Sequence, residues 1–162
     1  MRGSEMGSMD LKNILATLQA MAEGEIAVCN LYRACAERWP EDRDILDTLI
    51  DDELKHSAYL KKIYEMVEKN PGKYEVGRSF NPVGVRTFIS YVNQNTAKVK
   101  NGGLPRERMM NIALDIENSL LEQKFSELLK TGDIEFATLA KEIDSETLNH
   151  RKKIQERIAK SR

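Results

Sequence analysis

Four long stretches of the chain carry apolar residues at steps of three and four, the spacing typical of one face of an α-helix. The first stretch runs from Asp10 to about Trp39 and the second from about Arg43 to Lys69. The third runs from about Arg106 to Lys130 and the fourth from about Ile134 to Ala159. No segment shows the alternating pattern typical of a half-buried strand. The sequence therefore predicts an all-α protein with four long helices.

The breaks between these stretches carry residues that end helices or begin them. Pro40 ends the first helix, and Asn70-Pro71-Gly72 ends the second. Thr131-Gly132-Asp133 separates the third helix from the fourth, and Asp133 is a suitable N-cap. Because two of these breaks are short, we expect two antiparallel helical hairpins, one in each half of the chain.

The segment from Lys73 to Pro105 is longer than a turn between antiparallel neighbours requires. Within it, a shorter helix is expected from about Pro82, with Asn81 as its N-cap. Such a segment suits a crossover that leads from one end of a bundle to the other. The predicted fold is thus an antiparallel four-helix bundle, with a long crossover containing a short helix between helices 2 and 3.

Charged and polar residues interrupt the apolar face of every long helix. In the second helix, Glu53 and His56 occupy positions where the spacing calls for apolar side chains. Glu25 and Glu117 do so in the first and third helices, and the apolar face of the fourth passes through Glu146 or Thr147 and then His150. A buried carboxylate costs several kcal/mol unless it is paired, protonated or bound to a metal.

Taken singly, each of these residues has an ordinary explanation. A Glu at the edge of an apolar face usually points to solvent, and Glu and His one turn apart are common in helices. Their recurrence in four consecutive helices favours a shared site instead. The donor set matches that of a carboxylate-bridged di-metal centre in a four-helix bundle. In such a centre, two helices contribute one Glu each, and the other two contribute a Glu and a His each. Carboxylate oxygens and neutral imidazole nitrogens suit iron or manganese. The candidate metal ligands are Glu25, Glu53, His56, Glu117, Glu146 and His150.

The same segments resemble a known family. They are Ala22-Glu23-Gly24-Glu25 with Tyr32, Asp52-Glu53-Leu54-Lys55-His56, Asp115-Ile116-Glu117 and Glu146-Thr147-Leu148-Asn149-His150. With them, nearly the whole chain resembles the ferritin-like superfamily and, within it, the rubrerythrin-type di-iron domains. The resemblance implies two iron ions, with manganese or zinc as substitutes, and a reaction with peroxide or dioxygen or the oxidation of ferrous iron. It also implies a homodimer. Because the chain has no paired CxxC motif of a rubredoxin domain, redox turnover would require an external electron donor.

The last helix departs from the family motif. It reads Glu146-x-x-x-His150, whereas the second helix reads Glu53-x-x-His56. If the two histidines are aligned, Thr147 takes the place of Glu53. We therefore expect unequal metal positions, the stronger one formed by Glu25, Glu53 and His56. The alternative is a non-catalytic bundle with a degenerate metal site that acts as a binding or structural protein.

Composition and charge restrict the partners, the domain organisation and the cellular location that we expect. The chain has 162 residues and a formal net charge of -1, which argues against a nucleic-acid partner. Residues 1–9 resemble an expression leader with a natural start near Met9, so residues 10–162 are expected to form a single domain. Cys29 and Cys35 form no metal or disulfide framework and are expected to be reduced. No apolar run approaches the roughly 20 residues of a membrane span. These features predict a cytoplasmic protein with no membrane partner.

Overall fold

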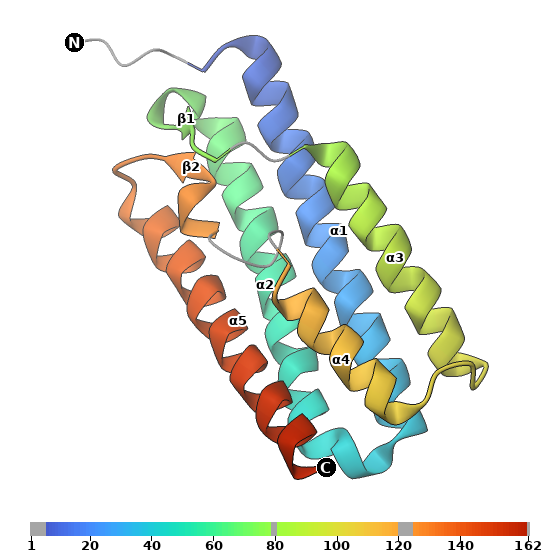
Figure 1. Ribbon diagram of the computed structural model, residues 1–162. Helices are drawn as coiled ribbons and strands as arrows, with labels where there is room; N and C mark the ends of the chain where they lie inside the picture. The colour runs from blue at the N-terminus through green and yellow to red at the C-terminus, as the bar shows by residue number, and fades with distance from the viewer. Residues whose placement is uncertain (1–5, 79–80, 120–124, 162) are drawn as a thin grey trace.

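The computed structural model describes residues 6–78, 81–119 and 125–161, and these are mainly helical (Figure 1). The five helices described are α1 (Ser8–Arg38), α2 (Arg43–Lys69), α3 (Pro82–Lys100), α4 (Arg106–Glu117) and α5 (Ile134–Lys160). Three short 3-10 turns are η1 (Pro40–Asp42), η2 (Pro71–Lys73) and η3 (Phe125–Glu127). Two two-residue strands, β1 (Glu75–Val76) and β2 (Leu129–Lys130), form a small antiparallel sheet. The all-α prediction is confirmed, and the small sheet was not predicted.

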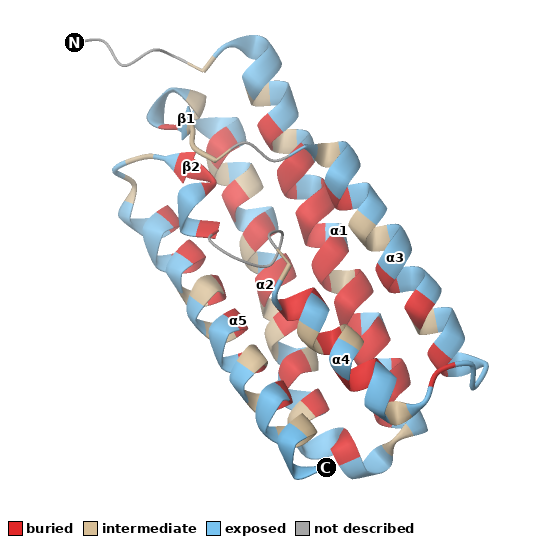
Figure 2. Ribbon diagram, viewed as in Figure 1, coloured by how far each residue is buried: buried red, intermediate tan, exposed pale blue. Residues whose placement is uncertain are grey.

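The long helices lie side by side, with their buried faces turned toward one another (Figures 1 and 2). Helix α1 packs against α2 and α3, and α5 packs against α2 and α4. None of the described helices combines the length and the apolar character that crossing a membrane requires.

The buried apolar residues form two clusters along the helices. The first cluster joins Leu18 of α1, Leu60 of α2 and Ile143 of α5 with the segment around Phe125. The second cluster contains Val28 and Leu31 of α1, Leu49 of α2, Ile116 of α4 and Ile154 of α5. In α1, α2 and α5, the sequence between the two clusters contains the polar residues that interrupt the apolar face. The fold therefore holds a polar layer between two apolar ones.

Helix α3 begins where the sequence predicts a helix. The backbone N–H of Val83 donates to the side chain of Asn81 over 2.9 Å, so Asn81 is the N-cap of α3. From there α3 extends over 19 residues and covers one side of α1 (Figure 1). At the start of α5, Asp133 accepts hydrogen bonds from the backbone N–H groups of Glu135 and Phe136. Asp133 is therefore the N-cap of α5, as predicted.

The third helix is shorter than predicted: it ends at Glu117, whereas the pattern extends to Lys130. Residues 120–124, with Leu120 and Leu121 of that pattern, lie outside the described residues. The backbone N–H groups of Phe125 and Ser126 donate to the carboxylate of Asp144 instead of to helical carbonyls. Phe125 and Leu128 are still buried. The apolar pattern here reflects burial of a 3-10 turn and a short strand, which spacing alone does not distinguish from a helix.

The small sheet depends on a glycine. The N–H of Gly77 donates to the carbonyl of Leu128 over 3.0 Å, next to the pairing of Val76 with Leu129. A Cβ atom on Gly77 would lie 2.2 Å from the carbonyl oxygen of Glu127. Only glycine allows the two backbones to approach this closely.

A buried carboxylate connects three elements at one end of the molecule. Asp42 of η1 is fully buried and accepts two hydrogen bonds of 2.6 Å from Arg106 at the start of α4. It accepts a third, of 2.9 Å, from Arg157 near the end of α5.

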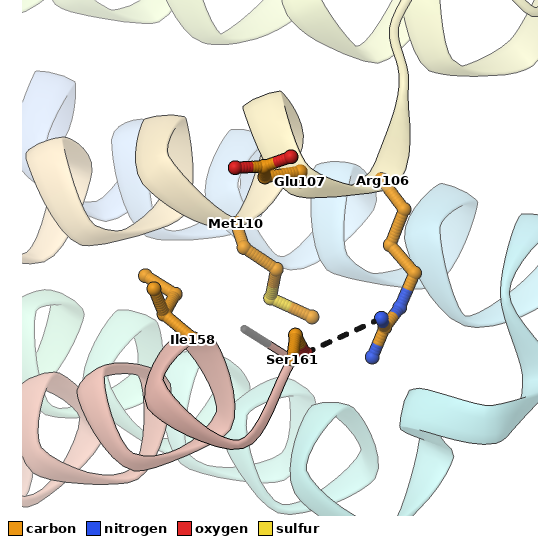
Figure 3. A pocket seen from close by; sticks show the side chains of 5 residues that line it. All are labelled: Arg106, Glu107, Met110, Ile158 and Ser161. Atoms are coloured by element: carbon orange, nitrogen blue, oxygen red, sulfur yellow. Dashed lines mark hydrogen bonds between the residues drawn. The ribbon is translucent and has the colours of Figure 1, made fainter.

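Close by, Arg106 also lines a pocket of about 230 Å³ between α4 and α5 and donates to Ser161 (Figure 3). This pocket lies at the opposite end of α4 from Glu117.

We predict that Asp42→Ala lowers the free energy of unfolding by about 3 kcal/mol, because it leaves two arginines without their shared buried partner. Urea denaturation measures the change. Glu41→Ala is the matched control, since Glu41 is largely exposed and lies 3.9 Å from Arg106; its expected cost is below about 1 kcal/mol. Equal unfolding free energies for the two variants would contradict this role of Asp42.

Candidate metal centre

Five of the six predicted ligands converge in the polar layer. Each comes from the inward face of its helix, between residues of the two apolar clusters or, for Glu117, at the last turn of α4. All five side chains belong to residues that are at most 1% exposed. They are Glu25 from α1, Glu53 and His56 from α2, Glu117 from α4 and His150 from α5.

These residues form two overlapping groups. Glu25, Glu53 and His56 make the first, and Glu53, Glu117 and His150 make the second; within each group the donor atoms lie within 4.8 Å of one another. One carboxylate oxygen of Glu53 lies 3.6 Å from Nδ1 of His56, and the other lies 3.3 Å from Nδ1 of His150. Nδ1 of His150 is also 3.5 Å from Glu117. Glu53 is therefore shared, with one oxygen turned to each half.

Both imidazole rings are oriented by a carboxylate on their outer side. Nε2 of His150 lies 2.9 Å from Asp52, and Nε2 of His56 lies 3.3 Å from Glu146. A carboxylate accepts a hydrogen bond, so Nε2 carries a proton and Nδ1 is the nitrogen directed inward, where it can bind a metal ion once it is deprotonated. An imidazole held in this way by an outer carboxylate is typical of metal-binding histidines.

The structure places Glu146 outside both groups. Its carboxylate lies 2.6 Å from the ammonium of Lys55 and 3.3 Å from His56, and its side chain is 18% exposed. Glu146 thus corresponds to Asp52, since each orients the histidine of the other helix. The inward position of α5 that precedes His150 by three residues is Thr147, which is buried.

Two further residues, Lys55 and Tyr32, make contacts around the centre, and those of Lys55 were not predicted from the sequence. Lys55 lies 3.6 Å from Asp52 and 3.4 Å from Glu142, in addition to its contact with Glu146. The hydrogen bond with Glu146 is the main reason that the pKa of Lys55 is raised. On the inner side, the buried hydroxyl of Tyr32 donates to Glu117 over 2.5 Å. The only sequence signal for the outer contacts is that Asp52 and Glu146 each precede a histidine by four residues.

The inward atoms fit a bound cation. Several inward atoms are buried and have no hydrogen-bond partner among the described residues. They are both oxygens of Glu53, Oε2 of Glu117 and Nδ1 of both histidines. These atoms present negative charge and lone pairs to one another, an arrangement that requires a proton or a metal ion between them. The chemistry of the donor set, oxygens with two imidazole nitrogens, suits iron, manganese or zinc.

Protonation compensates part of this charge when no metal is bound. Burial alone lowers the pKa of His150, but the carboxylates of Glu117 and Glu53 outweigh it and raise the pKa to about 11. Burial, together with the charge of Glu53, raises the pKa of Glu117. Burial would also raise the pKa of Glu53, but its interactions with Glu25 and with the two histidines lower it. In the metal-free protein, His150 is therefore an imidazolium between two carboxylates.

We predict that the metal-free protein loses stability as the pH rises. The folded state keeps the proton of His150 from its ordinary pKa of 6.5 up to about 11, whereas the unfolded chain releases it. This proton stabilises the folded state fully below pH 6.5, and the stabilisation is lost as the pH rises toward about 11. The loss is at most about 1.4 kcal/mol per pH unit. Ionisation of Glu117 acts in the same direction.

Urea denaturation in the presence of a chelator, at several pH values between about 7 and about 9, measures this loss. His150→Gln should have a flatter pH profile than the wild type. A wild-type unfolding free energy that stays constant over this range would contradict the assignment.

Comparison of the chain with protein-family models, with curated proteins and with solved structures gave no match.

Proposed function

We propose that this chain is a ferritin-like di-metal carboxylate protein of the rubrerythrin type. In this proposal α1, α2, α4 and α5 are the four helices of the bundle, and α3 belongs to the crossover between its halves. The observation that carries the proposal is the position of Glu53. Its two buried oxygens face the inward nitrogens of two histidines, each oriented by an outer carboxylate.

The residues divide into two sets that share this carboxylate. Glu25, Glu53 and His56 would hold one divalent ion, and Glu53, Glu117 and His150 would hold the other. Tyr32 fixes the orientation of Glu117, while Asp52 and Glu146 fix the two imidazoles. The apolar clusters on either side exclude water, which strengthens the attraction between the carboxylates and bound cations.

Two ferrous ions in this centre would supply the two electrons that, with two protons from solvent, reduce one hydrogen peroxide molecule to two water molecules. Alternatively, the ferrous ions would themselves be the substrate, oxidised by dioxygen or peroxide. The chain's own part is to provide neutral nitrogen and anionic oxygen donors and to connect the buried imidazoles with partly exposed carboxylates. Peroxide, dioxygen or ferrous iron is the proposed small-molecule partner. An external electron donor is required for repeated turnover, and a homodimer in the cytoplasm is the proposed setting.

A second candidate function is a binding or structural protein whose metal site is degenerate. The observation in its favour is Thr147, a neutral residue at the inward position of α5 where α2 has Glu53. The two candidate functions differ in the number of metal ions that the chain binds. The di-metal protein binds two ions per chain, whereas the structural protein binds fewer or none.

Metal titration tests the shared role of Glu53. We predict that the wild type binds two ferrous ions per chain under anaerobic conditions and that Glu53→Gln weakens both positions, because its carboxylate belongs to both groups. Glu25→Gln and Glu117→Gln should each weaken one position, by at least about tenfold for the lost charged ligand. Glu135→Gln is the control, since Glu135 pairs with Lys62 at the surface. A wild-type protein that binds no iron would favour the structural candidate.

Peroxide consumption tests the chemistry. The reduced, iron-loaded wild type should consume one peroxide for each pair of ferrous ions oxidised, because the reduction takes two electrons. His56→Ala should lose this stoichiometric oxidation, since it removes the nitrogen donor of one position. Stopped-flow absorbance after mixing with peroxide follows the reaction. Oxidation in His56→Ala at the wild-type rate and extent would contradict a mechanism that needs both ions.

A further inference from the structure

Helices α2 and α5 present the same local arrangement to one another. In α2, the outer carboxylate of Asp52 precedes an inward residue, Glu53, and a histidine follows three residues later. In α5, Glu146 and Thr147 occupy the corresponding two positions before His150. The equivalence is spatial, because Asp52 contacts the histidine of α5 and Glu146 contacts the histidine of α2. Thr147 therefore stands where the other helix supplies its shared carboxylate.

The hydroxyl of Thr147 differs from those of four other helical threonines. Thr17, Thr87, Thr96 and Thr138 each donate to the carbonyl oxygen four residues earlier, at 2.8 to 3.0 Å. Thr147 is 1% exposed, yet its Oγ1 has no hydrogen-bond partner among the described residues. A buried hydroxyl without a partner costs free energy that a bound acceptor would recover.

The surrounding charges identify the kind of acceptor. Glu25, Glu53 and Glu117 are the inward carboxylates of the two groups, so two divalent ions would exceed their charge by one. The outer carboxylates of Asp52 and Glu146 lie on the far side of the imidazoles and share Lys55. An anion that accepts from Thr147 would supply the oxygen donors and the negative charge that a fourth inward carboxylate would have given.

We propose that Thr147 marks a binding position for a small carboxylate anion beside the metal ions. This inference rests on the proposed metal centre, and it assigns that centre a ligand from solution. Oxygens of the anion complete the donor set, and the hydroxyl of Thr147 donates a hydrogen bond to it. Threonine is shorter than glutamate and carries no charge, so this position of α5 supplies no carboxylate oxygen of its own.

The test measures how formate changes the affinity for Co²⁺. Calorimetric titration of the whole chain with Co²⁺ is performed with saturating formate and with chloride at equal ionic strength. Visible absorption of the bound cobalt reports its coordination in the same samples. Formate should tighten cobalt binding by the wild type about tenfold, the effect of one charge-assisted contact of about 1.4 kcal/mol. It should also change the cobalt spectrum.

Three variants locate the effect. Thr147→Glu supplies the carboxylate within the chain, so it should bind cobalt tightly and respond to formate less than about twofold. Thr147→Val keeps the shape of the side chain but removes the hydroxyl, and should lose most of the formate response while it still binds cobalt. Thr138→Val, in the same helix, should respond as the wild type does. Circular dichroism melts establish that each variant is folded.

The outcomes separate the two proposals. Cobalt binding by the wild type with no formate response, or an undiminished response in Thr147→Val and Thr147→Glu, overturns the anion position and leaves the metal centre standing. Loss of cobalt binding in Thr147→Val with chloride alone would make Thr147 itself a metal ligand and also overturns the anion position. A wild type that binds no cobalt overturns the metal centre and this inference together.

Discussion

The structure depends on how a layer of buried charge is compensated between two apolar clusters. Glu53 has no access to solvent, and its oxygens face Nδ1 of His56 and Nδ1 of His150. Such a layer is stable only if cations lie between the donors. In the metal-free protein a proton on His150 supplies part of that charge, and we propose that metal ions supply it in the functional state. Metal binding would then release protons, which couples metal affinity to pH.

The rest of the fold holds the donors in place. Glu117 is the last residue of α4, and its position depends on the hydroxyl of Tyr32 as well as on the helix. The imidazoles depend on carboxylates that lie closer to solvent and are themselves held by Lys55. At the far end of α4, the buried Asp42 fixes the start of that helix against α5. Glu117 and the two imidazoles are therefore supported by residues that do not belong to the donor set.

Much of this arrangement is predictable from the sequence because helical spacing determines which face a residue occupies. Glu25, Glu53, His56, Glu117 and His150 were predicted to face inward, and all five are buried together. Glu146 was also predicted as a ligand. Neighbouring residues of a helix point about 100° apart, so the one-residue displacement turns Glu146 to the outer side of His56, and Thr147 faces inward in its place.

Other features could not be predicted, because they depend on distances between helices or on irregular backbone. The contacts of Lys55 with Glu142 and Glu146 join two helices whose relative rotation the spacing leaves open. The end of α4 at Glu117 was missed because Phe125 and Leu128 continue an apolar pattern although their segment forms a 3-10 turn and a short strand. The two-residue strands are too short to show any alternation.

Anomalous X-ray diffraction at the iron absorption edge, from crystals of the iron-loaded protein, tests the central claim most directly. The account predicts two anomalous peaks on either side of the Glu53 carboxylate, one beside His56 and the other beside His150. A single peak, or iron bound at the outer carboxylates Asp52 and Glu146 alone, would contradict it.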